Sequence, residues 1–580
     1  MAKHSITSRF KYWFDKQMAK GTPALTLLLA IATFLMVLVF SGIVVAFMIT
    51  PASFNGSADP QNFLEVMWGT FMHAIDGGTI VADTDLAYRI PMILVTVGGL
   101  VVLASLISII SGAFDAKVEE LRKGRSKVLE EGHTLILGWN SKIFTVINEI
   151  CIANESEKKP VIVIMADRDK VEMQDELNDK VNRRNTQIIV RSGNPMSLVD
   201  LEITHHHEAK SVVILAPDDM DSPDSFTIKT ALAVLNSPDR KPEKYHLVGE
   251  IHEPANLEAA QLVGGDEAHW VQGADLISRI TVQACRQSGL SHVLQDLLDF
   301  AGDEFYMTEQ KDLVGKTFGE AQLWFENSAV IGLEGKSHKS RINPPAKSVI
   351  KEGDRLIVIA KDDSEVRLAA SPGKPTAASI STSKPSAPKP EKTLLLGYNE
   401  NLETILTELA GYMPAGSQVK VVAETDKPKM PTLKGITVSF EKADTTSRQV
   451  LEKLKVESFD HIIVISYSDF FTTEIADGKT LVTLLHLRDI ASKKGVDISV
   501  VSEMIDDRNR ELAQVTAAND FIVSDKLISL MLAQIEQNQD LYEVFDELLS
   551  ADGSEVHLHP AEYYVKLGVE VDFYTVVASA

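Results

Sequence analysis

The residues whose types and spacing point most clearly to a chemical role form a short acidic, glycine-rich turn, Asp76-Gly77-Gly78-Thr79. Paired glycines permit unusual backbone angles, so carbonyl and carboxylate oxygens can face a common axis, an arrangement that attracts cations. The preceding stretch, Gln61 to Ile75, predicts a helix of about 22 Å, too short to cross a bilayer. The narrow segment that we expect here comprises His73, Ala74, Ile75, Asp76, Gly77, Gly78, Thr79 and Asp83.

Two apolar runs flank this turn and are long enough to span a membrane. The first, Ala24 to Ile49, lies in an uncharged interval and corresponds to about 39 Å of helix. The second, Ile90 to Phe114, contains no charged residue. A cleaved signal peptide is the alternative for the first run, which is too long and lacks a convincing small-residue cleavage site.

The distribution of basic residues predicts the orientation of the spans. Five basic residues precede the first span and five follow the second, whereas Thr50 to Tyr88 contains no Lys or Arg. Both termini are therefore expected to be cytoplasmic. Cations and aromatic residues mix in Arg9 to Phe14, which favours an interfacial helix over a disordered basic tail.

A span, a half-helix, a glycine turn and a second span together make a pore module. Four copies around an axis would keep the non-helical backbone within protein or water, as membrane depth requires. Cations are favoured over anions because the loop between the spans is acidic, carrying Asp59, Glu65, Asp76, Asp83 and Asp85. The alternative is an ordinary extracellular hairpin with solvated acids.

Small residues follow one face of the second span. Ser105, Ser108 and Gly112 recur at helical spacing after the Gly98-Gly99 pair. These residues are expected either to line or hinge the pore, or to allow close packing between helices.

The rest of the chain is an internal duplication. The pattern of a strand, a glycine turn and a helix at His133 to Ile150 returns at Lys392 to Leu409, and further strands correspond in order. Alternating strands and helices predict two parallel, doubly wound sheets of Rossmann-like topology. Helices at Asp275 to Asp299 and Asp525 to Leu549 are expected to lead away toward small β-rich appendages.

These patterns divide the chain into ten segments. They are an interfacial N-terminal helix (1–23), a first span (24–49), a pore helix and filter (61–79), a second span (90–114), a connector (115–132), a first lobe (133–299), its β-rich appendage (300–365), a flexible linker (366–391), a second lobe (392–545) and a second, incomplete appendage (546–580).

The strand ends of both lobes offer candidate ligand-binding residues. The first turn keeps one glycine of the dinucleotide motif GxGxxG and loses the two that admit a pyrophosphate. Acids end the second and fifth strands, where they either contact a nucleotide-like ligand or are merely solvated. The candidates are Gly138, Asn140, Asp167, Glu250, Gly397, Glu424 and Glu503.

An acidic cluster, a histidine run and two cysteines give less support for a functional site. Asp218, Asp219, Asp221 and Asp224 crowd the end of the fourth strand and could hold a hard cation such as calcium, although the spacing is not that of an EF-hand. The run His205 to His207 lacks chelating helical spacing, so we expect a surface segment. Two cysteines without a CxxC pair exclude a disulfide framework, and no catalytic set can be nominated.

The residues from Phe114 to Asn140, FDAKVEELRKGRSKVLEEGHTLILGWN, resemble the CASTOR/POLLUX ion channel family, and the resemblance continues through both repeats. The resemblance implies a homotetramer whose eight RCK (regulator of potassium conductance) domains form a gating ring. It further implies permeant potassium or calcium ions, or both, and regulation by a bound ion or nucleotide. At the filter, plant members resemble ADxGNHAD, whereas this chain has HAIDGGTIVAD from His73 to Asp83.

We therefore expect a ligand-gated cation channel, a multi-pass protein of the bacterial plasma (inner) membrane without a long targeting extension. A net charge of −24 disfavours a nucleic-acid partner. Calcium or a nucleotide is the expected regulatory ligand, with no certain cofactor and no enzyme activity. The alternatives are a non-conducting regulatory membrane protein and a membrane-tethered nucleotide-dependent oxidoreductase.

Overall fold

The computed structural model describes Tyr12 and residues 22–47, 63–83, 86–122, 124–336, 340–383, 387–513, 520–550 and 553–580. The chain forms two compact units, Met1–Gly124 and Arg125–Ala580, which we call the membrane unit and the C-terminal unit. The expected interfacial helix (1–23), apart from Tyr12 and its last two residues, and residues 48–62 of the loop between the spans lie outside the described part of the chain.

The membrane unit contains α2 (Thr22–Ala46), α3 (Phe63–Ile75), a 3-10 helix η1 (Gly77–Ala82) and α4 (Leu86–Arg122). Two stretches, Ala24–Ala46 and Leu86–Asp115, are long and apolar enough to cross a bilayer. Side chains from α2, α3 and α4 share a small core that includes Val44, Val66, Tyr88, Met92 and Val95.

Helix α4 extends beyond the span expected at 90–114 and includes the first part of the expected connector. It begins at Leu86, carries Pro91 in its early turns and continues to Arg122. The residues after Phe114 are mostly good helix formers such as Ala, Lys, Glu and Leu, so the helix propagates past the apolar stretch.

The first repeat is a six-stranded sheet of order β3-β2-β1-β4-β5-β6, and every neighbouring pair is parallel. This order is that of a doubly wound fold. The strands are β1 (Thr134–Gly138), β2 (Val161–Ala166), β3 (Gln187–Ser192), β4 (Ser211–Leu215), β5 (Leu247–Glu250) and β6 (Ala268–Val271). The helices are α5 (Ile143–Ala153), α6 (Lys170–Lys180), α7 (Leu198–Leu201), α8 (Pro223–Leu235) and α9 (Leu257–Gly264).

The second repeat has the same topology, in the order β13-β12-β11-β14-β15-β16. Its strands are β11 (Lys392–Leu396), β12 (Gln418–Ala423), β13 (Thr437–Lys442), β14 (His461–Val464), β15 (Ser499–Met504) and β16 (Asp520–Val523). Its helices are α13 (Leu402–Tyr412), α14 (Arg448–Leu454), α15 (Thr473–Lys494) and α16 (Asp507–Ala513). Central strands β1 and β11 are apolar and buried, as parallel strands covered on both faces must be.

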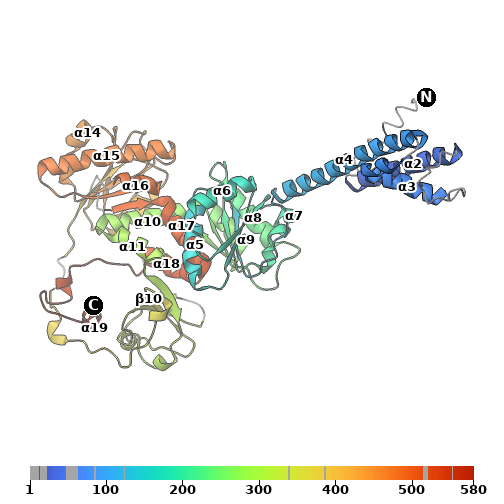
Figure 1. The fold of residues 1–580 in the computed structure, drawn as a ribbon. Coiled ribbons are helices and arrows are strands. Elements are labelled where there is room, and N and C mark those ends of the chain that lie inside the picture. The colour runs from blue at the N-terminus through green and yellow to red at the C-terminus, as the bar shows by residue number, and fades with distance from the viewer. Residues whose placement is uncertain are drawn as a thin grey trace. The chain divides into compact units, whose positions relative to one another are not determined.

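The two repeats exchange helices. Helix α10 (Gly273–Arg286) leaves the first sheet and packs on α13, β14, β15 and β16 of the second. Helix α17 (Ser524–Gln537) does the reverse and packs on α5, β4, β5 and β6 (Figure 1). Each is followed by a shorter helix, α11 (Leu290–Leu298) or α18 (Leu541–Leu549).

This exchange corrects the expectation that the helices at 275–299 and 525–549 lead only toward the appendages. The physical reason is their composition: α10 and α17 each bury ten of their 14 residues, and the apolar ones need a sheet on which to pack. One continuous hydrophobic core consequently contains residues of both repeats.

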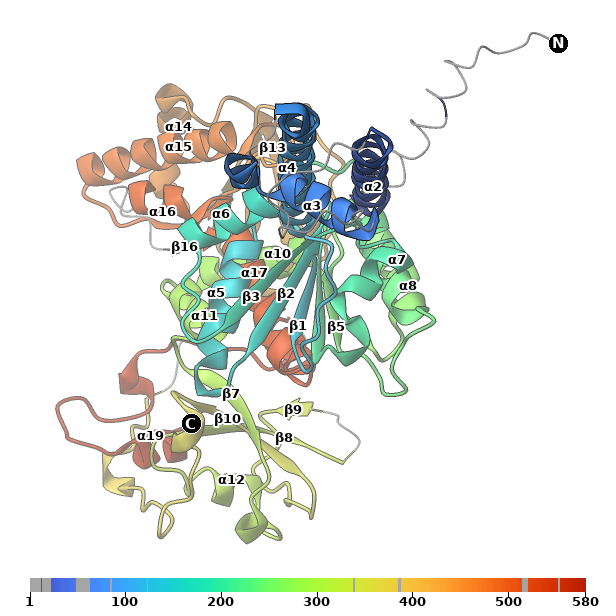
Figure 2. The same cartoon turned by 45° about the vertical axis from the view of Figure 1, so that its right-hand side comes forward.

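The first appendage is a four-stranded antiparallel sheet of order β7-β10-β8-β9 (Figure 2). Its strands are β7 (Glu304–Thr308), β8 (Ala329–Glu334), β9 (Ser340–Ile342) and β10 (Arg355–Ala360), and a short helix, α12 (Phe318–Ala321), accompanies them. Phe318, Phe325, Leu356 and Val358 fill its separate core.

The second appendage differs from the β-rich segment expected at 546–580. Within the described residues 553–580 the regular elements are a 3-10 turn at Ala561–Tyr563 and helix α19 (Phe573–Ser579). The extended backbone around Val565 pairs instead with Ile380, in the segment expected to be a flexible linker. Ser381 N donates to Tyr564 O at 2.9 Å, and Thr376 N donates to Thr575 Oγ1 at 2.9 Å. The linker is therefore held against the C-terminal segment, which uses it as its strand partner.

Candidate functional site

The Asp76–Thr79 turn follows α3 directly and is exposed in the membrane unit. Asp76 is the N-cap of η1, and its Oδ1 accepts a hydrogen bond from Gly78 N at 2.8 Å. The Thr79 hydroxyl donates to Asp76 O at 2.7 Å. The acid therefore organises the turn, while its exposure leaves the carboxylate accessible to cations.

His73 and Asp83, expected at the border of the narrow segment, are both buried and contact each other. His73 Nε2 lies 3.0 Å from Asp83 Oδ2, and each residue is 5% exposed. Ala74 is buried, whereas Ile75 is 60% exposed. The structure thus gathers only part of the expected set at the surface of the turn.

The small residues of α4 separate into two groups. A Cβ atom on Gly99 would overlap the carbonyl of Ala74 in α3, and one on Gly98 would overlap the Met36 sulfur in α2. Both glycines therefore act in close helix packing, the alternative to lining or hinging the pore. Farther along α4, Gly112 has no neighbouring atom within 4 Å, Ser108 is exposed and Ser105 is half-buried.

The glycine turns of the two lobes are structural equivalents. Gly138 and Gly397 both have φ of 105°, and a Cβ at either would overlap the carbonyl oxygen of Leu215 or Ile465. Asn140 Nδ2 donates to Ala216 O at 3.0 Å, so a side chain occupies the place where the dinucleotide motif requires a glycine.

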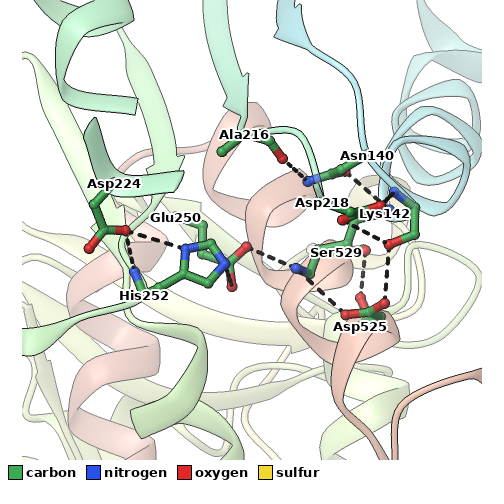
Figure 3. A network of polar contacts seen from close by, with 10 residues as sticks. Asn140, Lys142, Ala216, Asp218, Asp224, Glu250, His252, Asp525 and Ser529 are labelled. Atoms are coloured by element: carbon green, nitrogen blue, oxygen red, sulfur yellow. Dashed lines mark hydrogen bonds and ion pairs between the residues drawn. The ribbon is translucent and has the colours of Figure 1, made fainter. Parts of the chain in front are cut away.

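A buried lysine occupies the crevice of the first lobe. Lys142 Nζ lies 3.0 Å from Glu250 Oε2 and 3.5 Å from Asp525 Oδ1 of the exchanged helix α17 (Figure 3). Burial by itself lowers the pKa of Lys142, but the two carboxylates outweigh this effect and raise it above its usual value. The first crevice therefore contains its own cation, which joins the two repeats.

The second crevice lacks this cation. In the duplicated sequences GWNSK and GYNEN, Asn401 takes the position of Lys142 and Glu503 that of Glu250. Glu503 accepts hydrogen bonds from Asn399 Nδ2 at 2.9 Å, Ser466 N at 3.2 Å and Ser524 Oγ at 3.2 Å. Burial raises the pKa of Glu503 to about 7. The two crevices thus share a backbone plan but differ in charge.

Lys142, Asp525 and Asn401 are functional candidates that the analysis of the sequence missed. Comparison of the two repeats position by position would have exposed the replacement of Lys142 by Asn401. No local pattern marks Asp525, because it reaches the first crevice only through the exchange of helices.

Asp167 and Glu424, expected at the ends of equivalent strands, have different surroundings. Asp167 is exposed and lines the cleft between the repeats. Glu424 Oε1 instead lies 2.7 Å from Lys479 Nζ on α15. The acid of the second lobe is therefore neutralised within its own lobe.

The four acids from Asp218 to Asp224 do not converge. Asp218 accepts a hydrogen bond from Ser141 N at 2.8 Å. Asp224 is buried and accepts from His252 N at 2.8 Å, Glu253 N at 3.0 Å and Asn256 Nδ2 at 2.8 Å. The remaining two, Asp219 and Asp221, are exposed.

Asp224 is a structural residue rather than a metal ligand. Its counterpart in the second repeat, Asp477, accepts the same three hydrogen bonds, from Ile505 N, Asp506 N and Asn509 Nδ2. Throughout the described ranges, no group of three or more His, Cys, Asp or Glu side chains is arranged to hold a metal ion.

The run His205 to His207 is not simply a surface segment. His206 is fully buried and stacks on Tyr245, with ring centroids 6.5 Å apart. His205 Nδ1 lies 3.0 Å from Glu130 O, and the Gly132 amide donates to Glu208 O. The histidines therefore pack the chain that enters the first lobe. Burial also lowers the pKa of the neighbouring His133 to about 4.

A cleft of about 1770 Å³ lies between the repeats and receives the strand ends of both. Acids outnumber bases along its walls, which disfavours a multiply phosphorylated ligand. The acids lining it include Asp167, Asp218, Glu250, Glu400, Asp469, Glu503 and Asp525.

Comparison with known proteins identifies relatives over almost the whole chain. The family model described as "Castor and Pollux, part of voltage-gated ion channel" matches residues 274–374, from α10 into the linker. The chain is 28% identical to the ion channel CASTOR of Lotus japonicus over 626 aligned residues, which cover 99% of this chain and 71% of that protein. It is similar to the CASTOR and POLLUX ion channels.

Other CASTOR/POLLUX relatives and solved structures agree with this result. The probable ion channel CASTOR of Oryza sativa subsp. japonica is 29% identical over 89% of this chain and 62% of its own length. The solved human SLO3 gating ring covers 73% of this chain and 85% of its own, with a TM-score of 0.50 and 14% identity. The fold of this chain is thus a pair of helices long enough to span a membrane, followed by tandem Rossmann-like domains.

Proposed function

We propose that the protein is a ligand-gated cation channel. The observation that carries this proposal is the exposed, acid-capped Asp76–Thr79 turn between two helices long enough to cross a bilayer. The similarity to the ion channel CASTOR over 99% of the chain supports the same function. Four copies assemble around the turn, because one copy cannot enclose a pore.

Permeant cations, potassium or calcium or both, pass the oxygens of the Asp76–Thr79 turn. The Asp76 carboxylate is exposed, and Glu65 in the first turn of α3 is exposed as well. Negative charge near a pore concentrates cations and repels anions. The charges of the membrane unit therefore support cation conduction.

Gating is assigned to a ring of eight RCK domains from four chains. A calcium ion or a nucleotide binds near the cleft between the repeats more tightly in the open arrangement than in the closed one. The candidate contacts are Gly138, Asn140, Asp167, Glu250, Gly397, Glu424 and Glu503. The acidic lining of the cleft favours a cation over a nucleotide. We place the channel in the plasma (inner) membrane with both termini cytoplasmic.

The competing functions receive less support. An oxidoreductase needs a pyrophosphate site, and the Asn140 side chain and Lys142 occupy the turn that would form it. A non-conducting regulatory protein would not need an acid-capped turn between two spans.

Cation flux into liposomes tests the proposed function. Purified protein in liposomes is expected to pass potassium or calcium, with the flux changed by calcium or nucleotides on the side of the C-terminal unit. Asp76→Asn, which retains the turn hydrogen bond through its amide oxygen, should reduce the flux. Flux equal to that of protein-free liposomes, from a protein shown to be tetrameric, would contradict the proposal.

A further inference from the structure

An ionisable pair lies inside the membrane unit, behind the Asp76–Thr79 turn. His73 in the last turn of α3 and Asp83 at the end of η1 are joined at 3.0 Å, and both side chains are 7% exposed. Ionisable residues are costly within membrane-spanning regions, so those that occur usually act in function with a nearby partner. His73 and Asp83 are buried in the segment that joins the two helices long enough to span a membrane, and they are partners of each other.

The geometry determines how the pair holds its protons. His73 Nδ1 lies 2.7 Å from Gly69 O, and a carbonyl oxygen can only accept, so this nitrogen carries a hydrogen. Nε2 faces the Asp83 carboxyl group. The pair is therefore either an imidazolium with a carboxylate, or a neutral imidazole that accepts a hydrogen bond from a carboxylic acid. Both forms keep a direct hydrogen bond.

Further contacts fix both partners in place. The Arg89 Nε donates to Asp83 O at 2.5 Å, and the Thr96 hydroxyl of α4 donates to His73 O at 3.0 Å. The Tyr88 ring meets the His73 ring edge to face, with centroids 5.9 Å apart. The pair is thus tied to the start of α4 as well as to α3.

The pair closes the loop that contains the turn. Ten positions separate His73 from Asp83, and the exposed turn lies between them. Closing a loop at its base reduces the conformations available to its tip. We propose that His73 and Asp83 are positioning residues that hold the Asp76–Thr79 turn in one conformation and thereby determine which cations pass it. This inference rests on the proposed channel function.

Four variants of the full-length protein test the inference. Asp83→Leu and His73→Phe break the pair from either side, and the phenyl ring keeps the aromatic contact with Tyr88. Asp83→Asn keeps a hydrogen bond, because its amide can donate to Nε2. Asp115→Asn is the matched control, since it removes an exposed acid from α4 of the same unit without touching the pair.

Two measurements are made on each protein after tetramers have been isolated. The first is the permeability ratio from reversal potentials with potassium on one side of a bilayer and sodium on the other. The second is hydrogen exchange of the amides from residue 76 to residue 82. Breaking the pair should change the ratio several-fold and accelerate exchange, whereas Asp83→Asn and Asp115→Asn should remain near the wild type.

The outcomes separate this inference from the proposed function. A conducting wild type whose ratio and exchange are unaltered by Asp83→Leu and His73→Phe would overturn the role of the pair. Equal effects of Asp115→Asn and Asp83→Leu would overturn it too, because the loss of any acid from the unit would then suffice. A wild type that never conducts would refute the channel function, and the exchange rates would still show whether the pair orders the turn.

Discussion

Replacing Lys142 by asparagine should make the first crevice resemble the second. The Lys142 side chain is 9% exposed, that of Glu250 is 7% exposed, and their charged atoms are 3.0 Å apart. Removal of one partner from a buried pair typically costs about 3–5 kcal/mol, because the remaining charge loses its compensation. Lys142→Asn therefore leaves Glu250 in the situation that Glu503 already occupies opposite Asn401.

Glu503 in the second repeat gives an independent value for the free-energy cost of a buried carboxylate without a lysine partner. The pKa of Glu503 rises from 4.5 to about 7, which at about 1.36 kcal/mol per pH unit makes its ionised form about 3 kcal/mol less stable. A carboxyl whose pKa is raised in the folded state destabilises that state at pH values above the pKa of the unfolded chain. This penalty disappears as the pH falls and the carboxyl is protonated in both states. Lys142→Asn should thus cost about 3 kcal/mol at pH 8 and about 1 kcal/mol at pH 5.

Urea unfolding of the full chain in detergent, followed by pulse proteolysis, measures this difference. Wild type and variant are compared at both pH values, so that all other titrations cancel. The double variant Lys142→Asn with Glu250→Gln is the control, and its stability relative to Glu250→Gln should vary less with pH. An equal loss at pH 8 and pH 5, or a double variant that loses as much as the single one at pH 8, would refute the reasoning.

Two further predictions concern packing and pH. Gly99→Ala should lower the free energy of unfolding by about 1–3 kcal/mol and reduce the yield of folded protein, because the new Cβ overlaps Ala74 O. Gly112→Ala, at a position with no neighbouring atom within 4 Å, should have little effect, and thermal unfolding in detergent compares the two. The pKa of His133 is about 4, below its ordinary 6.5, so the unfolded chain binds more protons between these values. The free energy of unfolding should therefore fall by about 3 kcal/mol from pH 6.5 to pH 4. His133→Gln should make this fall smaller when it is measured by urea unfolding. An equal fall in the variant would contradict the assignment of this pH dependence to His133.

Much of the fold follows from local patterns in the sequence. Apolar runs without charge predict α2 and α4, and the strand and glycine pattern around Gly138 and Gly397 predicts the two parallel sheets. These features depend on residues that are close together in the chain. The exchange of α10 and α17 does not, because two buried helices can satisfy their apolar faces on either sheet with the same sequence.

The candidate sites were predictable only in part. The exposure of Asp76 is what an acid in a turn beside two glycines predicts, while its place in a pore stays a prediction. The burial of His73 against Asp83 and the bridge from Lys142 to Asp525 depend on tertiary contacts that spacing does not encode. Asp224 belongs to an acidic cluster in the sequence, but in the structure its carboxylate accepts hydrogen bonds from the backbone amides of His252 and Glu253.

Single-channel recording in planar bilayers tests the central claim most directly. Purified tetramers are studied with a potassium chloride gradient across the bilayer, and the reversal potential of the openings is measured. The account predicts discrete openings that reverse close to the potassium equilibrium potential and have a smaller conductance in Asp76→Asn. Openings that reverse near the chloride potential, or the absence of openings from intact tetramers with and without calcium and nucleotides, would contradict it.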